Sequence, residues 1–163
     1  MTVAEIFRQA NLTPHGPVSW GTPILESSEG GVYVVARVGD PTINCEACDL
    51  PFEDPLPRNL ILNLDRERRR WLPEEPVLYI GRTTQRLRQR IHQFDVHQVG
   101  QRSPHSGGQV VKLLRCDRWV YWSPTTQPRE RARAMLSAFE KQVGQLPFAV
   151  GGYGKKKRIW CID

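Results

Sequence analysis

The longest uninterrupted run of apolar side chains in this chain, Val32 to Ala36, is only five residues long. The run is rich in β-branched and aromatic residues and follows a pair of glycines, a pattern typical of a buried strand. It is far shorter than the roughly 20 apolar residues of a membrane-spanning helix. The first residues include Glu5 and Arg8, where a signal peptide would need an apolar run. The sequence therefore predicts a soluble, cytoplasmic protein that makes no contact with a membrane.

Strand-like composition recurs in two later segments, 76–81 and 118–122. The first begins at a proline, which cannot donate a hydrogen bond to a neighbouring strand, and ends at a glycine. The second is dominated by aromatic residues and valine, and a proline follows shortly after it. Together with the segment 31–37, these two segments predict a small antiparallel sheet.

Helical signatures fill most of the second half of the chain. The expected helices are a segment after Gly81, a short segment over 110–114, and the longest over 129–143. In the first of them, Leu87, Ile91 and Phe94 share one face, and Thr84 is the expected N-cap. Gly144 is the expected stop of the last helix. The order of strands and helices predicts an α+β domain.

The length of 163 residues fits a single domain over 1–163. Segment 38–75 is rich in prolines and acidic residues and is expected to be a surface insertion. Segment 151–163 combines glycines with the run Lys155 to Arg158, which predicts a basic C-terminal tail.

The net charge of +6 is distributed unevenly along the chain. Residues 1–77 hold 7 basic and 12 acidic side chains, whereas residues 78–163 hold 16 basic and 5 acidic ones. Most of the basic residues in the second half are arginines, which form planar bidentate pairs with phosphate. A polyanionic partner is therefore expected on that half.

Two tripeptides stand on the first two predicted strands: Gly31-Val32-Tyr33 and Tyr79-Ile80-Gly81. If the strands pair antiparallel, the two phenol groups can face the same side, and the glycines allow close approach of a backbone or a ligand. An arginine-rich helix follows directly. With these residues the chain resembles the GIY-YIG nuclease superfamily, and the likeness extends over residues 18–150.

The resemblance includes three further pieces in the same order. Arg90, eleven residues after Tyr79, matches the essential arginine of the helix, with Arg88 as the alternative. The segment His105 to Gly108 matches a histidine-containing turn, and the segment 144–149 matches the turn that closes the last helix.

The resemblance implies a three-stranded antiparallel sheet flanked by helices, and cleavage of double-stranded DNA with Mg²⁺ or Mn²⁺. In that interpretation, the phenol of one tyrosine, Tyr33 or Tyr79, orients or deprotonates the attacking water, and the phenol of the other holds the phosphate. Arg90 stabilises charge on phosphorus, and His105 assists proton transfer. The predicted phosphate contacts outside this catalytic set are Arg82, Arg86, Arg88, Lys112, Lys155, Lys156 and Lys157.

Three positions depart from the family pattern. Ala132 stands where the resemblance expects a metal-binding glutamate, and Val150 stands where it expects the closing asparagine. Glu130 is the nearest substitute for the missing carboxylate, although it points elsewhere around a helix. The spacing of 46 positions from Tyr33 to Tyr79 is the third departure, because the inserted segment is unusually long.

We interpret the chain as a divalent-metal-dependent DNA endonuclease, of restriction or defence type, present in a form deficient in cleavage because of Ala132. The alanine is then an active-site change made to trap DNA. The alternative is a non-cleaving DNA-binding relative, and an enzyme that holds its metal differently is a further alternative. Cutting both strands with one site per chain suggests a homodimer. A third class is a protein-interaction domain with zinc at Cys45 and Cys48. Zinc is not expected, because no second Cys/His pair of comparable spacing accompanies these two.

Overall fold

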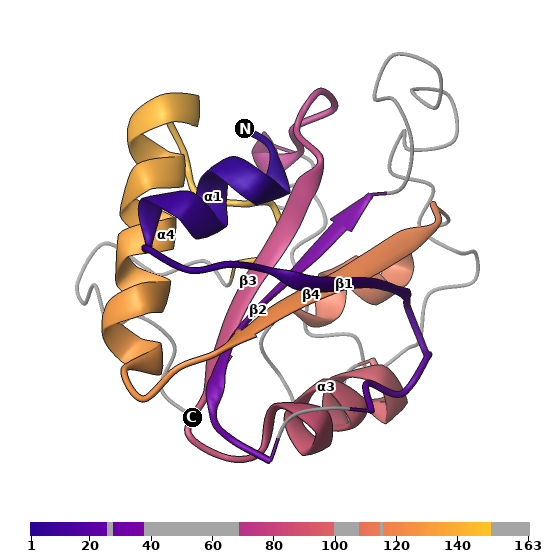
Figure 1. Ribbon diagram of the computed structural model, residues 1–163. Helices are drawn as coiled ribbons and strands as arrows, with labels where there is room; N and C mark the ends of the chain where they lie inside the picture. Colours follow the sequence, from indigo (N-terminus) through magenta and orange to yellow (C-terminus); the bar gives the residue numbers. More distant parts are fainter. Residues whose placement is uncertain (26–27, 38–68, 100–107, 115, 151–163) are drawn as a thin grey trace, which may run out of the picture.

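A computed structural model describes residues 1–25, 28–37, 69–99, 108–114 and 116–150. In chain order, the described elements are α1 (Val3–Gln9), β1 (His15–Ser19), β2 (Gly31–Arg37), β3 (Val77–Thr83), α3 (Leu87–Val96), the 3₁₀ helix η1 (Gln109–Leu113), β4 (Arg118–Pro124) and α4 (Pro128–Val143). They form an α+β fold around one antiparallel sheet (Figure 1). The expected fold class is confirmed.

The sheet has four strands in the order β1-β4-β2-β3. All three predicted strands are confirmed, with β3 and β4 each extending two residues beyond the predicted end. The expectation of three strands is corrected by β1, which pairs with β4 at the edge of the sheet. Its sequence contains Gly16 and Pro17, residues depleted in strands, and a proline is tolerated where one side of the strand has no partner.

The helix that follows β3 has the predicted buried face, made of Leu87, Ile91 and Phe94. Its N-cap is Arg86 and not Thr84, so that prediction was wrong. The hydroxyl of the preceding Thr83 accepts a hydrogen bond from the backbone N–H of Gln85 at 3.0 Å, which turns the chain before the helix begins.

The last helix, α4, and the short helix η1 match their predicted positions closely. Gly144 ends α4 in the left-handed region, with a φ of 89°, as a glycine C-cap does. The N-terminal helix α1 was not predicted. It is held by a capping box in which Thr2 and Glu5 each bond to the other's backbone N–H.

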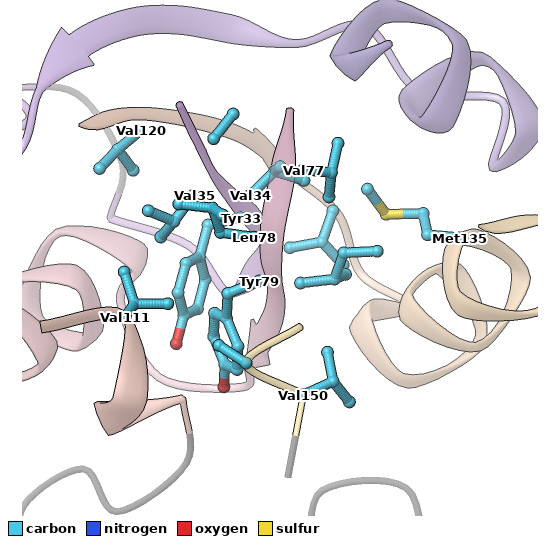
Figure 2. Packing of buried hydrophobic residues seen from close by; sticks show 14 of the residues in the cluster. Tyr33, Val34, Val35, Val77, Leu78, Tyr79, Val111, Val120, Met135 and Val150 are labelled. Carbon is cyan, nitrogen blue, oxygen red and sulfur yellow. The ribbon is translucent and has the colours of Figure 1, made fainter. Parts of the chain in front are cut away.

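Helices cover both faces of the sheet. The buried residues of α4 include Met135, Leu136 and Phe139, and α4 packs on β2 and β3 and against α1. Figure 2 shows Met135 approaching the sheet on one side, and Tyr33 and Tyr79 pointing away from it toward Val111 of η1. The tyrosines therefore lie on the face that α3 and η1 cover.

The segment after α4 returns to the sheet. The backbone N–H of Ala149 donates to the carbonyl of Leu78 at 2.9 Å, which satisfies part of the open edge of β3. Phe148 is buried against Trp71 in an edge-to-face contact with 5.0 Å between the ring centroids. Trp71 belongs to the described end of the expected insertion, and the rest of that insertion lies outside the described residues.

Candidate functional site

The two motif tyrosines lie side by side on one face of the sheet. In the β2–β3 register, Tyr33 is opposite Gly81 and Val35 is opposite Tyr79, so the tyrosines are diagonal neighbours. Their ring centroids are 5.9 Å apart, and Figure 2 shows both hydroxyl oxygens pointing the same way. The predicted antiparallel pairing and the shared direction of the phenols are confirmed as geometry.

Both tyrosine side chains are buried, with 1% of Tyr33 and 4% of Tyr79 exposed. Phe94 of α3 packs against both rings, with centroid distances of 6.4 Å to Tyr33 and 5.2 Å to Tyr79. Two polar oxygens are thus held in an environment of low dielectric constant, where hydrogen bonds and charge interactions are stronger than in water.

Two glycines make room for the tyrosine rings, and a third, Gly31, makes room for Leu87 and the backbone of β4. A Cβ at Gly81 would lie 2.5 Å from the hydroxyl oxygen of Tyr33, so the phenol ring lies directly on this backbone. A Cβ at Gly108 would lie 2.6 Å from two ring carbons of Tyr79. At Gly31 it would meet the carbonyl oxygen of Ser123 and lie 2.7 Å from Leu87 Cδ1.

These contacts explain physically why glycine stands at these positions. Real Cβ atoms do not approach other atoms this closely, so alanine at any of the three positions forces its neighbours to move. Gly108 also has a φ of 72°, which favours glycine for a second reason. The contact of Gly108 with the ring of Tyr79 was not predicted. The glycine pair at 107–108 was the only feature of the sequence that could have indicated it.

Helix α3 carries its two candidate arginines on different sides. Arg88 and Arg90 are about 200° apart around the helix. Arg88 lines a cavity whose wall includes Trp20 and Val120, on the side of α3 toward β1 and β4. Arg90 does not line that cavity, and its guanidinium donates to the side-chain oxygen of Gln93 on the same helix at 3.3 Å. The choice between Arg90 and Arg88 as the partner of the tyrosine pair stays a prediction.

The remaining predicted phosphate contacts differ in their surroundings. Arg86 and Arg88 are exposed, and Arg82 is half-buried on β3. By strand alternation, Arg82 shares the face of Val32, opposite to that of the tyrosines. Lys112 is half-buried on η1.

Lys112 serves the packing of α3. Its ammonium donates to the backbone carbonyls of Phe94, at 3.1 Å, and of Asp95, at the C-terminal end of α3. It also lies 6.0 Å from the ring centroid of Trp20. Burial lowers the pKa of Lys112, the positive charge of Arg118 acts in the same direction, and Asp95 opposes them. A cation at this end of a helix stabilises it, and the predicted contact of Lys112 with DNA stays a prediction.

Several predicted residues lie outside the described part of the chain: His105, Cys45, Cys48, Lys155, Lys156 and Lys157. The described residue nearest to His105 in sequence is Gly108, which lies against the ring of Tyr79.

The expected metal-binding position is apolar and closed. Ala132 is 4% exposed on the buried face of α4, while Glu130 is exposed in the first turn of that helix. Val150 is fully buried, and Figure 2 shows it beside β3, near Tyr79. Within the described ranges, no three His, Cys, Asp or Glu side chains are grouped so that they could hold a metal ion. The described residues therefore do not fit the Mg²⁺ or Mn²⁺ site that the resemblance implies.

Comparison with known proteins returns no match to a family model, a curated protein or a solved structure. None of the helices in the described ranges has both the length and the apolar character needed to cross a membrane.

Proposed function

We propose that this chain is a DNA nuclease domain of GIY-YIG type that binds duplex DNA and is deficient in cleavage. The observation that supports the proposal best is the pairing of Tyr33 and Tyr79. Two phenols from separate strands lie together with their hydroxyls pointing the same way, each ring resting on a glycine. Ordinary packing in a core needs neither the oxygens nor the glycines beneath the rings.

In this proposal the phenols and Arg90 act on one phosphodiester. A phenol hydroxyl both donates and accepts hydrogen bonds, so one can hold a phosphate oxygen while the other orients the attacking water. The guanidinium of Arg90 is always charged and matches the geometry of a phosphate. Negative charge that develops on the phosphate oxygens is stabilised most strongly in a buried site.

Ala132 explains why cleavage is expected to be weak. A methyl group offers no ligand to a hard cation, and the exposed Glu130 is on another side of α4. The same position, together with Val150, supports the second candidate, a DNA-binding relative that has lost cleavage altogether. A restriction or defence role and a homodimer remain parts of the proposal without support from the fold.

The first experiment measures plasmid cleavage and duplex binding by the unmodified chain and its A132E variant in Mg²⁺. We expect the unmodified chain to bind without cutting and A132E to cut, because the resemblance implies a metal-binding carboxylate at this position. Since α4 covers the sheet face opposite the tyrosines, cutting by A132E also requires the new carboxylate to reach the phosphate from that side. The matched control is A132Q, which has nearly the same volume at this buried position but no charge. If A132E folds and binds DNA yet cuts no more than A132Q, the nuclease proposal fails and the non-cleaving relative is the better account.

The phenol oxygens are tested in the A132E background with Y33F and Y79F. Each variant keeps the ring and its packing, and we expect cleavage to fall by about 10² or more, because positioned proton transfer contributes that much. A parallel R90A variant should lower the slope of log affinity against log salt by about 0.9, the value for one lost phosphate contact. R8A, at an exposed position on α1, is the control.

A further inference from the structure

A cavity of about 600 Å³ lies on the side of α3 that faces away from Tyr79. Its walls come from α3, from the segment after β1, and from Val120 of β4. A volume of this size falls within the roughly 300–1,000 Å³ of small-molecule sites. The cavity takes no part in the chemistry proposed above, because neither the tyrosines nor Arg90 line it.

The inner surface of the cavity is largely apolar. Ile24, Ile91 and Val120 contribute buried side chains, and Leu25 contributes a side chain that is 84% exposed. Trp20 forms a rigid wall, because its edge-to-face contact with Phe94 holds the indole in place. Exposed leucines are ordinary when isolated, but one at the edge of an apolar cavity adds to a surface that a ligand can cover.

The mouth of the cavity is cationic. Arg86 and Arg88 line it, and in the described part of the chain neither guanidinium has an acidic partner. The carboxylate that lines the cavity is Asp95, so two positive charges and one negative charge are present and the lining is net positive.

We propose that this cavity binds a small organic anion with a compact apolar body, such as an aryl carboxylate. The apolar body would displace water from the walls formed by Ile24, Leu25 and Ile91. The carboxylate would pair with Arg86 and Arg88, whose planar donor groups match its two oxygens. The duplex DNA of the proposed function uses the same arginines as phosphate contacts, so DNA is the competing explanation for them.

The test titrates the full chain with 2-naphthoate, followed by backbone amide shifts and calorimetry. Two control ligands separate the contributions: 2-naphthol keeps the rings without the charge at pH 7, and acetate keeps the charge without the rings. We expect 2-naphthoate to bind more tightly than either control, with shifts concentrated at Thr22, Ile24, Leu25 and Ile91.

Variants then assign the two halves of the site. The double variant R86A/R88A should weaken the binding of 2-naphthoate about tenfold and leave the binding of 2-naphthol unchanged. Each exposed ion pair is expected to contribute roughly fivefold to the affinity, and the two contributions overlap in part. L25S should weaken both ring ligands. R133A, an exposed arginine of α4 remote from the cavity, is the matched control and should change neither.

Two results would overturn the proposal. One is that 2-naphthoate binds the chain no more tightly than acetate does, or that it binds R86A/R88A as tightly as the unmodified chain. The other is R86A/R88A weakening DNA while the organic anion never binds, which assigns the arginines to DNA alone and keeps the proposed function. Conversely, anion binding that depends on both arginines in a chain that binds no DNA would support the cavity and refute the nuclease.

Discussion

The two faces of the sheet bury side chains of different kinds. On β2 and β3 the buried side chains toward α4 are aliphatic, with Val34 and Ile80 opposite one another. The other face carries Tyr33 and Tyr79, whose rings lie on glycines. The first face needs only apolar volume of about the right shape, which many residues supply. The second also needs a particular pairing, a glycine opposite an aromatic ring, as at Gly81 and Tyr33.

The largest loss of stability is expected on the aliphatic side, where F139A empties a fully buried position of α4. Phenylalanine-to-alanine changes in a core cost about 3–5 kcal/mol, because burial is lost and a cavity remains. Urea unfolding of F139A against the natural chain measures the difference. E140A, at the next and exposed position, should change the free energy of unfolding by less than about 0.5 kcal/mol. A loss below about 1 kcal/mol at Phe139 would show that α4 packs loosely.

A smaller but more specific effect is expected on the aromatic side, from G81A. The added methyl group collides with the ring of Tyr33, and overpacking of this kind costs about 1–3 kcal/mol. The collision is tested by a double-mutant cycle with Y33A, which removes the ring. We expect G81A to cost at least 1 kcal/mol less in the Y33A background, because the two residues are in contact. Additive effects would contradict the packing of that ring on Gly81.

The smallest effect on stability is expected from Lys112, whose ammonium bonds to the C-terminal end of α3. Burial lowers its pKa below the usual value of 10.5, so the unfolded chain binds the proton more tightly than the folded chain. The free energy of unfolding should therefore rise with pH between the lowered pKa and 10.5, relative to a K112M variant. Chemical denaturation of both proteins over that range measures the difference. K112M should also leave the salt dependence of DNA binding unchanged if Lys112 makes no phosphate contact.

Local pattern was enough to predict the elements that carry strong periodicity. The β-branched run of β2 and the apolar spacing of Leu87, Ile91 and Phe94 in α3 are properties of short segments, and the structure confirms both. Gly144 was predictable as a C-cap for the same reason, since a left-handed residue at that place favours glycine.

Elements whose stability comes from distant partners were not predictable. Strand β1 contains Gly16 and Pro17 and exists because β4 supplies its hydrogen bonds. Helix α1 has seven residues, too few to be stable alone, and packs on α4. Nothing in the sequence indicates that the ammonium of Lys112 reaches the end of α3. Its partners there, Phe94 and Asp95, lie eighteen and seventeen residues earlier in the chain.

The sequence by itself determined the identity of the candidate site: two tyrosines beside glycines on strands, an arginine helix directly after them, and alanine at the position of the expected carboxylate. These depend on residue type and spacing along short segments. Only the tertiary structure decided that the phenols share one face, that Arg88 and not Arg90 lines the cavity beside α3, and that Gly108 supports the ring of Tyr79. Strand register, the rotation of α3 on the sheet and the approach of η1 bring together residues far apart in the chain, and packing across the whole domain fixes all three.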